Sequence, residues 1–507
     1  MSIMLNSLCF SVLSVFLFLY FFLKYYCSSE KILPPSPPKL PIIGNLHNLG
    51  LHPHRSLQAL AQQCGPFMLL YFGSVPVLVI SSANAAIDVM KTHDNIFSSR
   101  IKSSVFDKLV YNCKDVVLAP YGEYWRQMKS MCVVHLLSNK KVQSFQKVRE
   151  EETTILLKKI QESYYYSPMN LSETFAVLAN DIVCRTAFGR KCSGDQESGK
   201  KLKELLARFA ELIGTFDLGD YIPWLSWVSY VNGLNARLEK VAKELDDLFE
   251  GIVEEHANRL KKKCDASDYD DVQDFVDVLL RIQKENTTGF PIDRVTIKAL
   301  ILDMFIAGTD TTYTTLEWTM TELLRHPKVM KKLQNEVRTT AGTKSNVLEE
   351  DLGKMKYLKA VIKEVLRLHP PLPLLIHRES IKDVNIKGYD IAEGTQVLIN
   401  AWAIGRDPES WEEVEEFKPE RFLDSCVDFK GHDFQLIPFG AGRRGCPGIQ
   451  FATILIEMVL ANILHQCDWT PLPYHGAKEQ EIHLTESTGI SVHRKFPLIA
   501  VPSPPCL

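Results

Sequence analysis

One cysteine lies in a sequence context that packing alone explains poorly. Residues 439–448 read FGAGRRGCPG, so that four glycines and two arginines surround Cys446 just ahead of an apolar run. We expect Pro447 at the first position of a following helix, because proline is pre-organised for that position. Cys446 then lies at the positive end of the helix, where a thiolate is stabilised and becomes a ready metal ligand.

The same run favours a large, flat ligand that carries carboxylates. Glycines let a backbone lie against a planar group, and Arg444 can pair with a carboxylate. A haem with its propionates meets both requirements. The alternative interpretation is an inert, buried cysteine beside a glycine turn, since free cysteine usually behaves as a small hydrophobic residue.

A second polar group interrupts an apolar helix upstream. Asp310 and Thr311 fall midway along the helical spacing of residues 295–325, and Gly308 lies one turn before Thr311. Polar side chains on an apolar face need a partner or a function. Taken alone, Thr311 is expected to hydrogen-bond the carbonyl four residues back and to bend the helix.

Helical spacing dominates the elements that must position these residues. It covers residues 241–260, 272–282, 295–324, 329–337, 357–368 and 448–465. Two β-rich runs, 67–72 and 77–80, flank GSVP at 73–76 and predict a hairpin, with further strands at 396–399 and 496–501. Because no Gly/Ser linker divides the chain after the N-terminal region, we predict one large domain over 42–507, mainly α with a minor β part.

The N-terminus predicts a membrane anchor followed by a stiff hinge. Residues 3–23 are apolar and approach the roughly 20 residues that span a bilayer. Lys24, Lys31 and Lys39 follow this run, so the positive-inside rule places the remaining chain in the cytosol. Five prolines in 24–41 favour an extended, semi-rigid spacer. The alternative is a cleaved signal peptide, although no basic residue precedes the apolar run.

Composition limits the class of protein and its partners. The 507 residues carry 58 Lys and Arg against 61 Asp and Glu, a net charge of -3, so nucleic acid is not an expected partner. Twelve cysteines occur without a C-x-x-C pair, which resembles neither a disulfide framework nor a zinc site. We therefore expect the body to fold in a reducing compartment.

The sequence around Cys446 resembles the haem-binding signature of the cytochrome P450 superfamily, F-x-x-G-x-R-x-C-x-G, without departure. The resemblance covers nearly the whole chain and is closest to plant A-type enzymes of the large family numbered seventy-one. Its other motifs are the anchor and hinge, Trp125-Arg126, AGTDTT at 307–312, EVLR at 364–367 and FKPERF at 417–422.

This resemblance implies a cytochrome P450-type fold that binds haem b, with Cys446 as the axial ligand of the iron. A thiolate ligand favours cleavage of the O–O bond. The resemblance also implies that Asp310 and Thr311 deliver protons during oxygen activation. Positions that bind the haem propionates correspond to Trp125, Arg126, Arg378 and Arg444. A structural ion cluster corresponds to Glu364, Arg367 and Arg421.

Four segments correspond to substrate-recognition regions of the family, namely 100–120, 209–216, 372–376 and 487–490. Their apolar character implies a lipophilic small molecule. The predicted wall consists of Val105, Phe106, Leu109, Phe216, Leu374, Leu375, Ile376 and Ile490. About half of these are expected to be ordinary core residues, because such side chains are usually buried.

The function implied is a monooxygenase of the endoplasmic reticulum membrane with a cytosolic catalytic domain. It would take electrons from NADPH through NADPH–cytochrome P450 reductase, and use O2 to oxidise a plant specialised metabolite of terpenoid, coumarin or alkaloid type. Two alternatives stay open. One is a haem-thiolate isomerase or dehydratase that needs neither O2 nor reductase, and the other is a non-enzymatic haem carrier or sensor.

Overall fold

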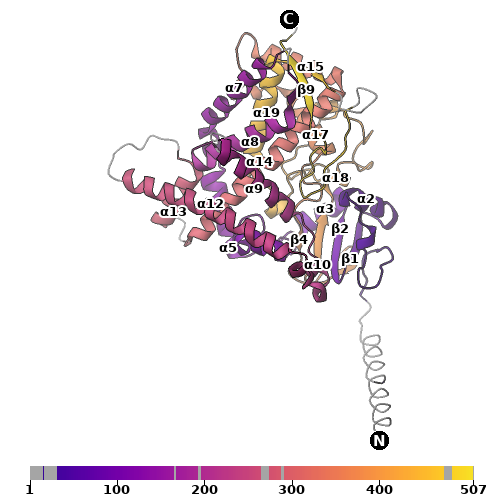
Figure 1. The fold of residues 1–507 in the computed structure, drawn as a ribbon. Helices are drawn as coiled ribbons and strands as arrows, with labels where there is room; N and C mark the ends of the chain where they lie inside the picture. Colours follow the sequence, from indigo (N-terminus) through magenta and orange to yellow (C-terminus); the bar gives the residue numbers. More distant parts are fainter. Residues whose placement is uncertain are drawn as a thin grey trace.

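A long helix, α14 (Arg294–Arg325), runs through the middle of the fold (Figure 1). It begins where the Asp293 carboxylate accepts a hydrogen bond from the Thr296 N–H at 2.6 Å, an N-cap that satisfies one free donor. It ends before Pro327, which disfavours helical geometry at His326 and starts α15. Because α8, α17 and α19 pack against it, α14 is predominantly buried.

The computed structural model describes residues 15, 31–164, 167–191, 196–263, 273–286, 290–472 and 482–505. The longer helices besides α14 are α2 (Pro53–Cys64), α7 (Gln146–Glu162), α8 (Leu171–Phe188), α9 (Gln196–Ile213), α12 (Leu234–Lys263), α13 (Phe275–Glu285), α15 (Pro327–Ala341), α17 (Lys356–Leu368) and α19 (Ile449–Gln466). The shorter ones are α3 (Ala83–Ile87), α4 (Ser104–Leu109), α5 (Glu123–Met131), α6 (Asn139–Ser144), α10 (Leu218–Tyr221), α11 (Val228–Val231), α16 (Glu349–Leu352) and α18 (Ala401–Ile404). The prediction of a mainly helical fold with a minor β part is confirmed.

The main sheet has the strand order β1-β2-β7-β4. Its strands are β1 (Phe67–Phe72), β2 (Val75–Ile80), β7 (Gln396–Ile399) and β4 (Arg378–Glu379). The predicted hairpin is present, with a two-residue turn in which Gly73 takes a positive φ of 58°. A second sheet joins β3 (Met169–Asn170), β9 (Ile499–Ser503) and β8 (Asp468–Pro471), and β5 (Val384–Ile386) pairs with β6 (Tyr389–Ile391).

The described part of the proline-rich segment is attached to the body. The Leu69 N–H of β1 donates to the Pro35 carbonyl at 2.9 Å, and the Asn45 amide donates to Pro37 and Pro38. Pro34 and Pro37 are buried. From Pro34 to Pro38 the segment predicted as a semi-rigid hinge therefore packs against β1 and Asn45.

The predicted anchor, residues 3–23, lies outside the described residues apart from Val15. Among the described residues, one helix is long and apolar enough to qualify as a membrane span by length and composition, namely α19. More than half of its apolar window is buried inside the body.

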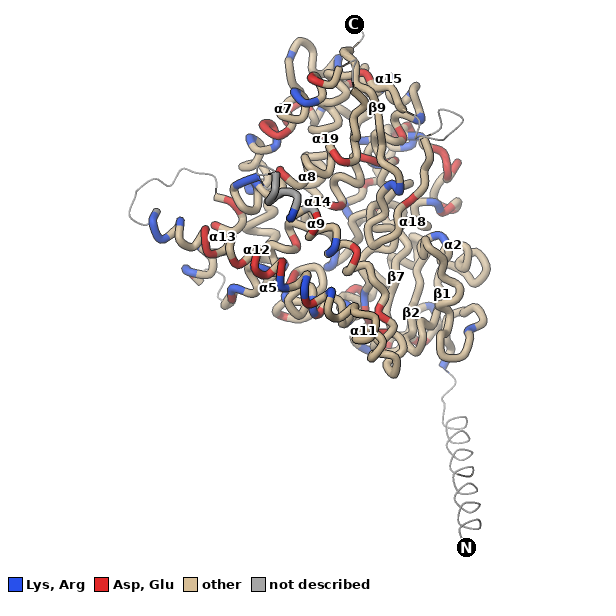
Figure 2. Tube along the Cα trace, in the orientation of Figure 1, with Lys and Arg blue, Asp and Glu red and all other residues tan. Residues whose placement is uncertain are grey.

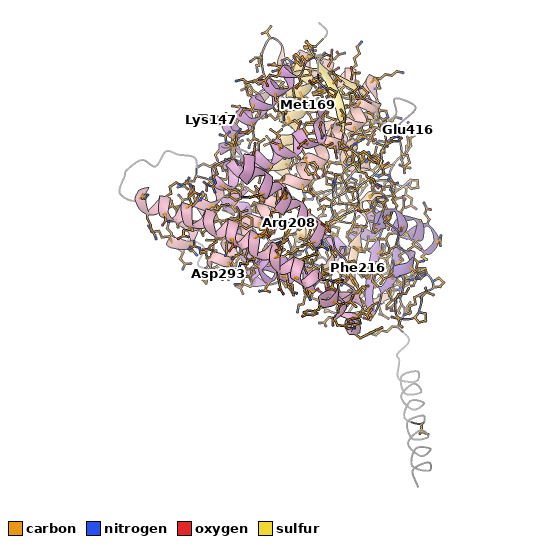
Figure 3. The ribbon with its side chains drawn as sticks, viewed as in Figure 1. Lys147, Met169, Arg208, Phe216, Asp293 and Glu416 are labelled. Carbon is orange, nitrogen blue, oxygen red and sulfur yellow. The ribbon has the colours of Figure 1, made fainter. Side chains whose placement is uncertain are left out.

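The surface differs between two ends of the molecule. Charged residues of both signs alternate along α7, α12 and α13, whereas few occur around α2, β1, β2 and α11 (Figure 2). Large apolar side chains are exposed at this second end, where Phe216 lies beside α10 (Figure 3). We call these residues the apolar end: Ile32, Leu33, Leu40, Ile42, Phe216, Leu218, Trp224, Trp227, Tyr230 and Val231.

Hydrogen bonds through the turn of the first hairpin connect the two chain segments of the apolar end. The Gly73 N–H donates to the Ile43 carbonyl at 3.1 Å, and the Ser74 N–H donates to the Tyr221 carbonyl at 3.0 Å. The N-terminal segment and the α10–α11 region therefore form one continuous surface. Exposed apolar patches of this kind mark interaction surfaces.

Candidate active site

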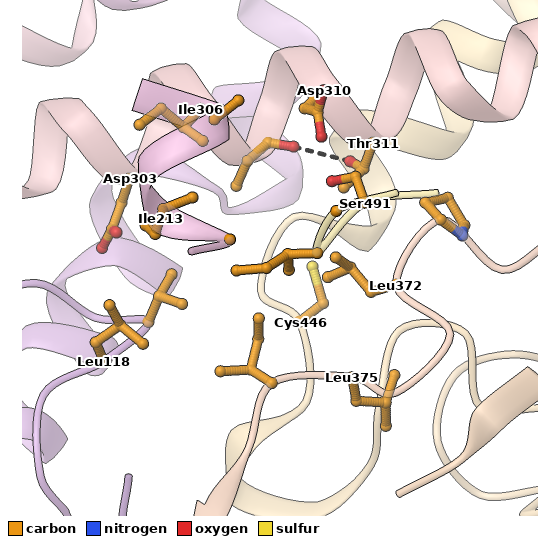
Figure 4. A pocket seen from close by; sticks show the side chains of 18 of the residues that line it. Leu118, Ile213, Asp303, Ile306, Asp310, Thr311, Leu372, Leu375, Cys446 and Ser491 are labelled. Atoms are coloured by element: carbon orange, nitrogen blue, oxygen red, sulfur yellow. Dashed lines mark hydrogen bonds between the residues drawn. The ribbon is translucent and has the colours of Figure 1, made fainter. Parts of the chain in front are cut away.

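A cavity of about 1810 Å³ lies beside α14. Its walls come from α14, from α9, from the loop that joins α17 to β4, and from the glycine-rich loop 439–448 (Figure 4). The lining is mostly apolar, with a few polar side chains on α14 and Cys446 facing them. Ligand pockets typically measure roughly 300–1,000 Å³, so this cavity has room for a large group and a second molecule.

Cys446 is held in the glycine-rich loop with its side chain open to the cavity. Its N–H donates to the Phe439 carbonyl at 2.9 Å, and the Gly448 N–H donates to its Sγ at 3.3 Å. Removal from bulk water raises the pKa of the thiol, while the Gly448 N–H and the charge of Lys129 lower it. These two groups favour the thiolate, which is the form that binds metal.

The expected start of α19 needs a correction. The helix begins at Ile449 with Gly448 as its N-cap, so Pro447 lies before the helix and not at its first position. Cys446 nevertheless receives an N–H at the amino end of α19, because the chain turns at Gly448.

The backbone conformation and close contacts of the loop require one of its four glycines, Gly442. Its φ of 68° is in the left-handed region, and an added Cβ would overlap the Met90 carbonyl oxygen and the Asp94 carboxylate. Asp94 also accepts a hydrogen bond from the Arg443 N–H at 2.9 Å. The loop is therefore fixed closely against residues 88–94.

Three buried arginines, Arg100, Arg378 and Arg444, line the cavity near this loop, and we call them the cavity cluster. Arg444 donates to the carbonyls of Ser98 and Ala119 at 2.6 and 2.5 Å. In the described part of the chain, no carboxylate accepts a hydrogen bond from Arg444 or Arg100. Arg378 does bond one, the Asp94 carboxylate, at 3.0 Å.

The positive charge of the cavity cluster is poorly compensated. Burial and the neighbouring arginines lower the pKa of Arg444 to about 9, and the same causes lower that of Arg100. Burial, with the charge of Arg100, also lowers the pKa of His377 to about 4. Carbonyl groups satisfy the N–H donors but do not neutralise charge, so the site favours an anionic ligand.

One of the two propionate-binding residues predicted on α5 lies away from the cavity. Trp125 is buried, donates to the Val116 carbonyl at 2.9 Å and stacks under Arg444 at 4.0 Å. Arg126 is exposed and lies outside the cavity lining. Lys129 lines the cavity in its place, because residues four apart share a helix face.

Lys129 reaches the loop that carries Cys446. Its ammonium group donates to the Arg443 carbonyl and, at 3.3 Å, to the Gly445 carbonyl. Burial and the charge of Arg444 lower its pKa to about 8. Lys129 was not among the predicted ligands, although its spacing of four residues from Trp125 indicates a shared helix face.

Asp310 and Thr311 line the cavity on α14, as predicted (Figure 4). The Thr311 hydroxyl donates to the Ala307 carbonyl at 2.8 Å, which is the bond expected of a packed helical threonine. A Cβ added to Gly308 would meet a Val183 methyl at 3.0 Å, so a larger residue here would crowd α8. The polar pair thus faces the same space as Cys446.

Comparisons with known proteins assign these features to one family. The family model for Cytochrome P450 matches residues 34–495. Cytochrome P450 736A117 of Prunus mume is 57% identical over 508 residues, covering 99% of this chain and 96% of that protein. The chain belongs to the cytochrome P450 family.

Other relatives and solved structures are similar over most of their length. Norfluorocurarine oxidase of Strychnos is 52% identical over 509 residues, covering 98% of both chains. Cytochrome P450 71A26 of Arabidopsis thaliana is 54% identical over 470 residues, covering 92% of this chain and 93% of that one. A zebra fish cytochrome P450 with abiraterone superposes with a TM-score of 0.75 at 25% identity, covering 90% and 100% of the two chains.

Enzymes of this family are haem-containing monooxygenases, and this cytochrome P450 offers a fitting site. Cys446 supplies a sulfur open to the cavity, and the cavity cluster with Lys129 supplies positive charge beside it that is only partly compensated. A haem bound there would place its iron on the sulfur and its propionates among these cations.

A second ion cluster, Glu364, Arg367 and Arg421, has the predicted structural form, and we call it the balanced cluster. Arg367 makes two hydrogen bonds to the Glu364 carboxylate, at 2.7 and 2.8 Å. Arg421 donates to the same carboxylate at 3.1 Å. Glu364 and Arg367 are buried, and the other hydrogen bonds of the Arg367 guanidinium end on backbone carbonyls of residues 405–416. The cluster ties α17 to the segment before the glycine-rich loop.

Six of the eight residues of the predicted substrate wall line the cavity. They are Phe106, Phe216, Leu374, Leu375, Ile376 and Ile490. Val105 and Leu109 do not, because they lie on the face of α4 that packs into the core. Residues lining the cavity that were not named include Leu118, Ile213, Ile306, Leu372 and Ser491 (Figure 4).

Proposed function

We propose that this cytochrome P450 uses O2 and NADPH-derived electrons, delivered by NADPH–cytochrome P450 reductase, to oxidise a lipophilic plant specialised metabolite. One observation carries the proposal: the Cys446 sulfur and the Asp310–Thr311 pair open onto the same apolar cavity. A pocket of this character suits an apolar substrate positioned by a few polar groups. The proposed substrate classes are terpenoid, coumarin and alkaloid.

In this proposal the haem supplies the oxygen-activating chemistry, and the chain supplies position and protons. The Thr311 hydroxyl donates its hydrogen to the Ala307 carbonyl. Its oxygen can therefore accept a hydrogen bond from a donor in the cavity. Asp310 lies next to it, half-buried at the cavity wall, and relays protons from water. The surrounding apolar side chains exclude bulk water from the reacting centre.

The substrate proposal draws on the cavity and on the names of relatives. Six apolar residues of the predicted wall, from four separate segments, line the cavity. One relative is named for the oxidation of norfluorocurarine, and zebra fish relatives have been solved with abiraterone and with progesterone. Each name describes that protein, and together they support a bulky, lipophilic substrate here.

We further propose that the chain is anchored in the endoplasmic reticulum membrane with its catalytic body in the cytosol. The apolar run 3–23 and the basic residues after it support this orientation. The apolar end adds an exposed surface that includes residues 32–42, which follow the anchor in sequence. Protease added outside sealed microsomes should digest the body, whereas protection of the body would reverse the orientation.

Microsomes that contain this protein, with and without reductase, test the proposed reaction. Compounds of the three classes are first screened for substrate-induced shifts of the haem spectrum, and binders are then tested for turnover. Product that requires NADPH, O2 and reductase supports the proposal. Conversion of a peroxide without O2 or reductase supports the isomerase alternative, and haem binding without any turnover supports the carrier alternative.

Thr311→Ala tests the proton-delivery role. We expect haem content and substrate binding to be retained while product per NADPH falls and hydrogen peroxide rises, because general acid catalysis contributes roughly 10² to 10⁴ in rate. The measurement is peroxide formed per NADPH consumed, at matched haem concentration. A purely packing role predicts less folded protein with normal coupling, and that result would remove Thr311 from the mechanism.

A further inference from the structure

Two carboxyl groups from distant parts of the sequence lie together at the cavity wall. Asp303 projects from α14, and Asp115 lies in the segment between α4 and α5. Both line the cavity and both are buried, with 0% of Asp115 and 9% of Asp303 exposed. Aspartate is rarely buried to this degree unless it is paired.

Each carboxyl receives a backbone N–H from the same short segment. The Val116 N–H donates to Asp303 Oδ2 at 2.7 Å, and the Leu118 N–H donates to Asp115 Oδ2 at 2.8 Å. Both carboxyls are therefore held at residues 115–118, close enough for the charge of Asp115 to act on Asp303. Asp115 Oδ1 is buried, and the described residues offer it no donor.

Two ionised carboxylates in contact in a buried site repel each other, and one of them then stays protonated. Burial, and after it the negative charge of Asp115, raises the pKa of Asp303 well above its ordinary value. A proton on Asp303 also supplies the donor that Asp115 Oδ1 lacks. Two cations, Arg100 and Arg444, interact with the charge of Asp115. The other ionisable groups that face the pair are Cys113, Cys132 and Tyr124, whose own pKa values burial raises.

The segment held by this pair also orients the cations around the cofactor pocket. The Val116 carbonyl accepts hydrogen bonds from the Trp125 indole at 2.9 Å and from Arg444 at 3.3 Å. The Val117 carbonyl accepts one from Arg100 at 2.8 Å, and the Ala119 carbonyl one from Arg444 at 2.5 Å. The N–H groups of residues 116 and 118 thus point to the acids, while the carbonyls point to the cations.

We propose that Asp115 and Asp303 share one proton, and that this acid pair holds residues 115–119 in the shape that aims Arg100 and Arg444 at the haem propionates. Both aspartates are positioning residues, because they act on the cofactor through the segment and the arginines. The inference rests on the proposed role of the cavity cluster in binding propionates. It does not rest on the proposed substrate or reaction.

The experiment compares Asp303→Asn, Asp303→Leu and wild type as full-length, haem-loaded proteins. Asparagine can accept from the Val116 N–H and donate to Asp115, as a protonated Asp303 does, whereas leucine can do neither. The readout is the rate of haem transfer to excess apomyoglobin. Loss of an outer-shell partner typically weakens cofactor binding by about tenfold or more, so we expect that acceleration for Asp303→Leu and near wild-type rates for Asp303→Asn.

Infrared difference spectra of wild type against Asp303→Asn at neutral pH test the shared proton itself. We expect a carboxylic-acid C=O band in wild type that the variant lacks. Asp247→Asn removes an exposed carboxylate on α12 and serves as the control, with no expected change in either measurement.

Three results would overturn the inference. The first is no carboxylic-acid band in wild type, and the second is haem loss from Asp303→Asn as fast as from Asp303→Leu. The third is wild-type haem retention in Asp303→Leu.

If Asp303→Leu does not fold, Asp303→Ala replaces it, because alanine likewise can neither accept from the Val116 N–H nor donate to Asp115. Fast haem loss is then expected from Asp303→Ala, and wild-type haem retention in that variant would also overturn the inference. All of these readouts are independent of turnover, so a failed monooxygenase assay does not affect them.

Discussion

The balanced cluster and the cavity cluster contain the same residue type in opposite electrostatic situations. In the balanced cluster, one buried carboxylate lies between two guanidinium groups, and the remaining donors end on carbonyls. In the cavity cluster, three buried guanidinium groups meet carbonyls and a single hydrogen-bonded carboxylate, that of Asp94.

This difference separates a structural role from a ligand-binding role. A buried ion pair whose partners both come from the protein is satisfied in the absence of any ligand. Buried cations that lack anions are unfavourable until a ligand provides the negative charge. The cavity cluster is therefore expected to matter chiefly for haem retention, and the balanced cluster for folding.

Glu364→Ala should have the largest effect. It leaves Arg367 and Arg421 buried without their carboxylate, and removal of one partner from a buried ion pair costs about 3–5 kcal/mol. We expect little folded protein and a much lower unfolding midpoint in circular dichroism. Glu413→Ala removes an exposed partner of Lys418 and should change the midpoint little. Equal unfolding midpoints for Glu364→Ala and Glu413→Ala would contradict the structural role of the balanced cluster.

Arg444→Met should affect haem retention strongly and folding only weakly, the reverse of Glu364→Ala. The haem-free protein loses a cation that Arg378 repels, so its unfolding midpoint should fall far less than in Glu364→Ala. Haem transfer to apomyoglobin should accelerate by about tenfold or more, as for other outer-shell partners. Arg126→Met is the control, because Arg126 is exposed and outside the cavity lining. Haem loss from Arg126→Met as fast as from Arg444→Met would contradict this assignment.

Glu457 on α19 gives a smaller, pH-dependent test of what burial does to an acid. Burial raises its pKa to about 7, and the charge of Lys359 only partly offsets this. The folded state then binds more protons than the unfolded state between pH 4.5 and about 7, so stability falls as pH rises through that window. Glu457→Gln should become more stable relative to wild type across it. If the unfolding midpoints of Glu457→Gln and wild type change with pH in parallel, the raised pKa of Glu457 is contradicted. Glu254→Gln, which changes an exposed residue, is the control and should run parallel to wild type.

The chemistry and the main helices could be predicted from the sequence because their signals are local. The loop around Cys446, the i to i+3 pair Glu364 and Arg367, and the long apolar period of α14 each lie within a short stretch. The hairpin was predictable because glycine at a two-residue turn is a strong signal.

The errors have physical causes. Arg126 was predicted because it directly follows Trp125 in the motif, and Lys129 was not predicted. Lys129 shares the cavity-facing side of α5 with Trp125, whereas Arg126 does not. Val105 and Leu109 could not be separated from Phe106, since all three lie on the same apolar side of α4, opposite Asp107 and Lys108. The contact of Asp303 with residues 115–118 joins segments far apart in sequence, where no local pattern exists.

The most direct test of the account is the spectrum of the reduced, carbon-monoxide-bound protein. Wild type, Cys446→Ala and Cys426→Ala are compared at equal protein concentration, and Cys426 serves as the control because it is an exposed free cysteine outside the cavity. We predict a thiolate-type Soret band in wild type and in Cys426→Ala, and its loss in Cys446→Ala. An unchanged band in Cys446→Ala would contradict the assignment of the haem ligand, on which the proposed function depends.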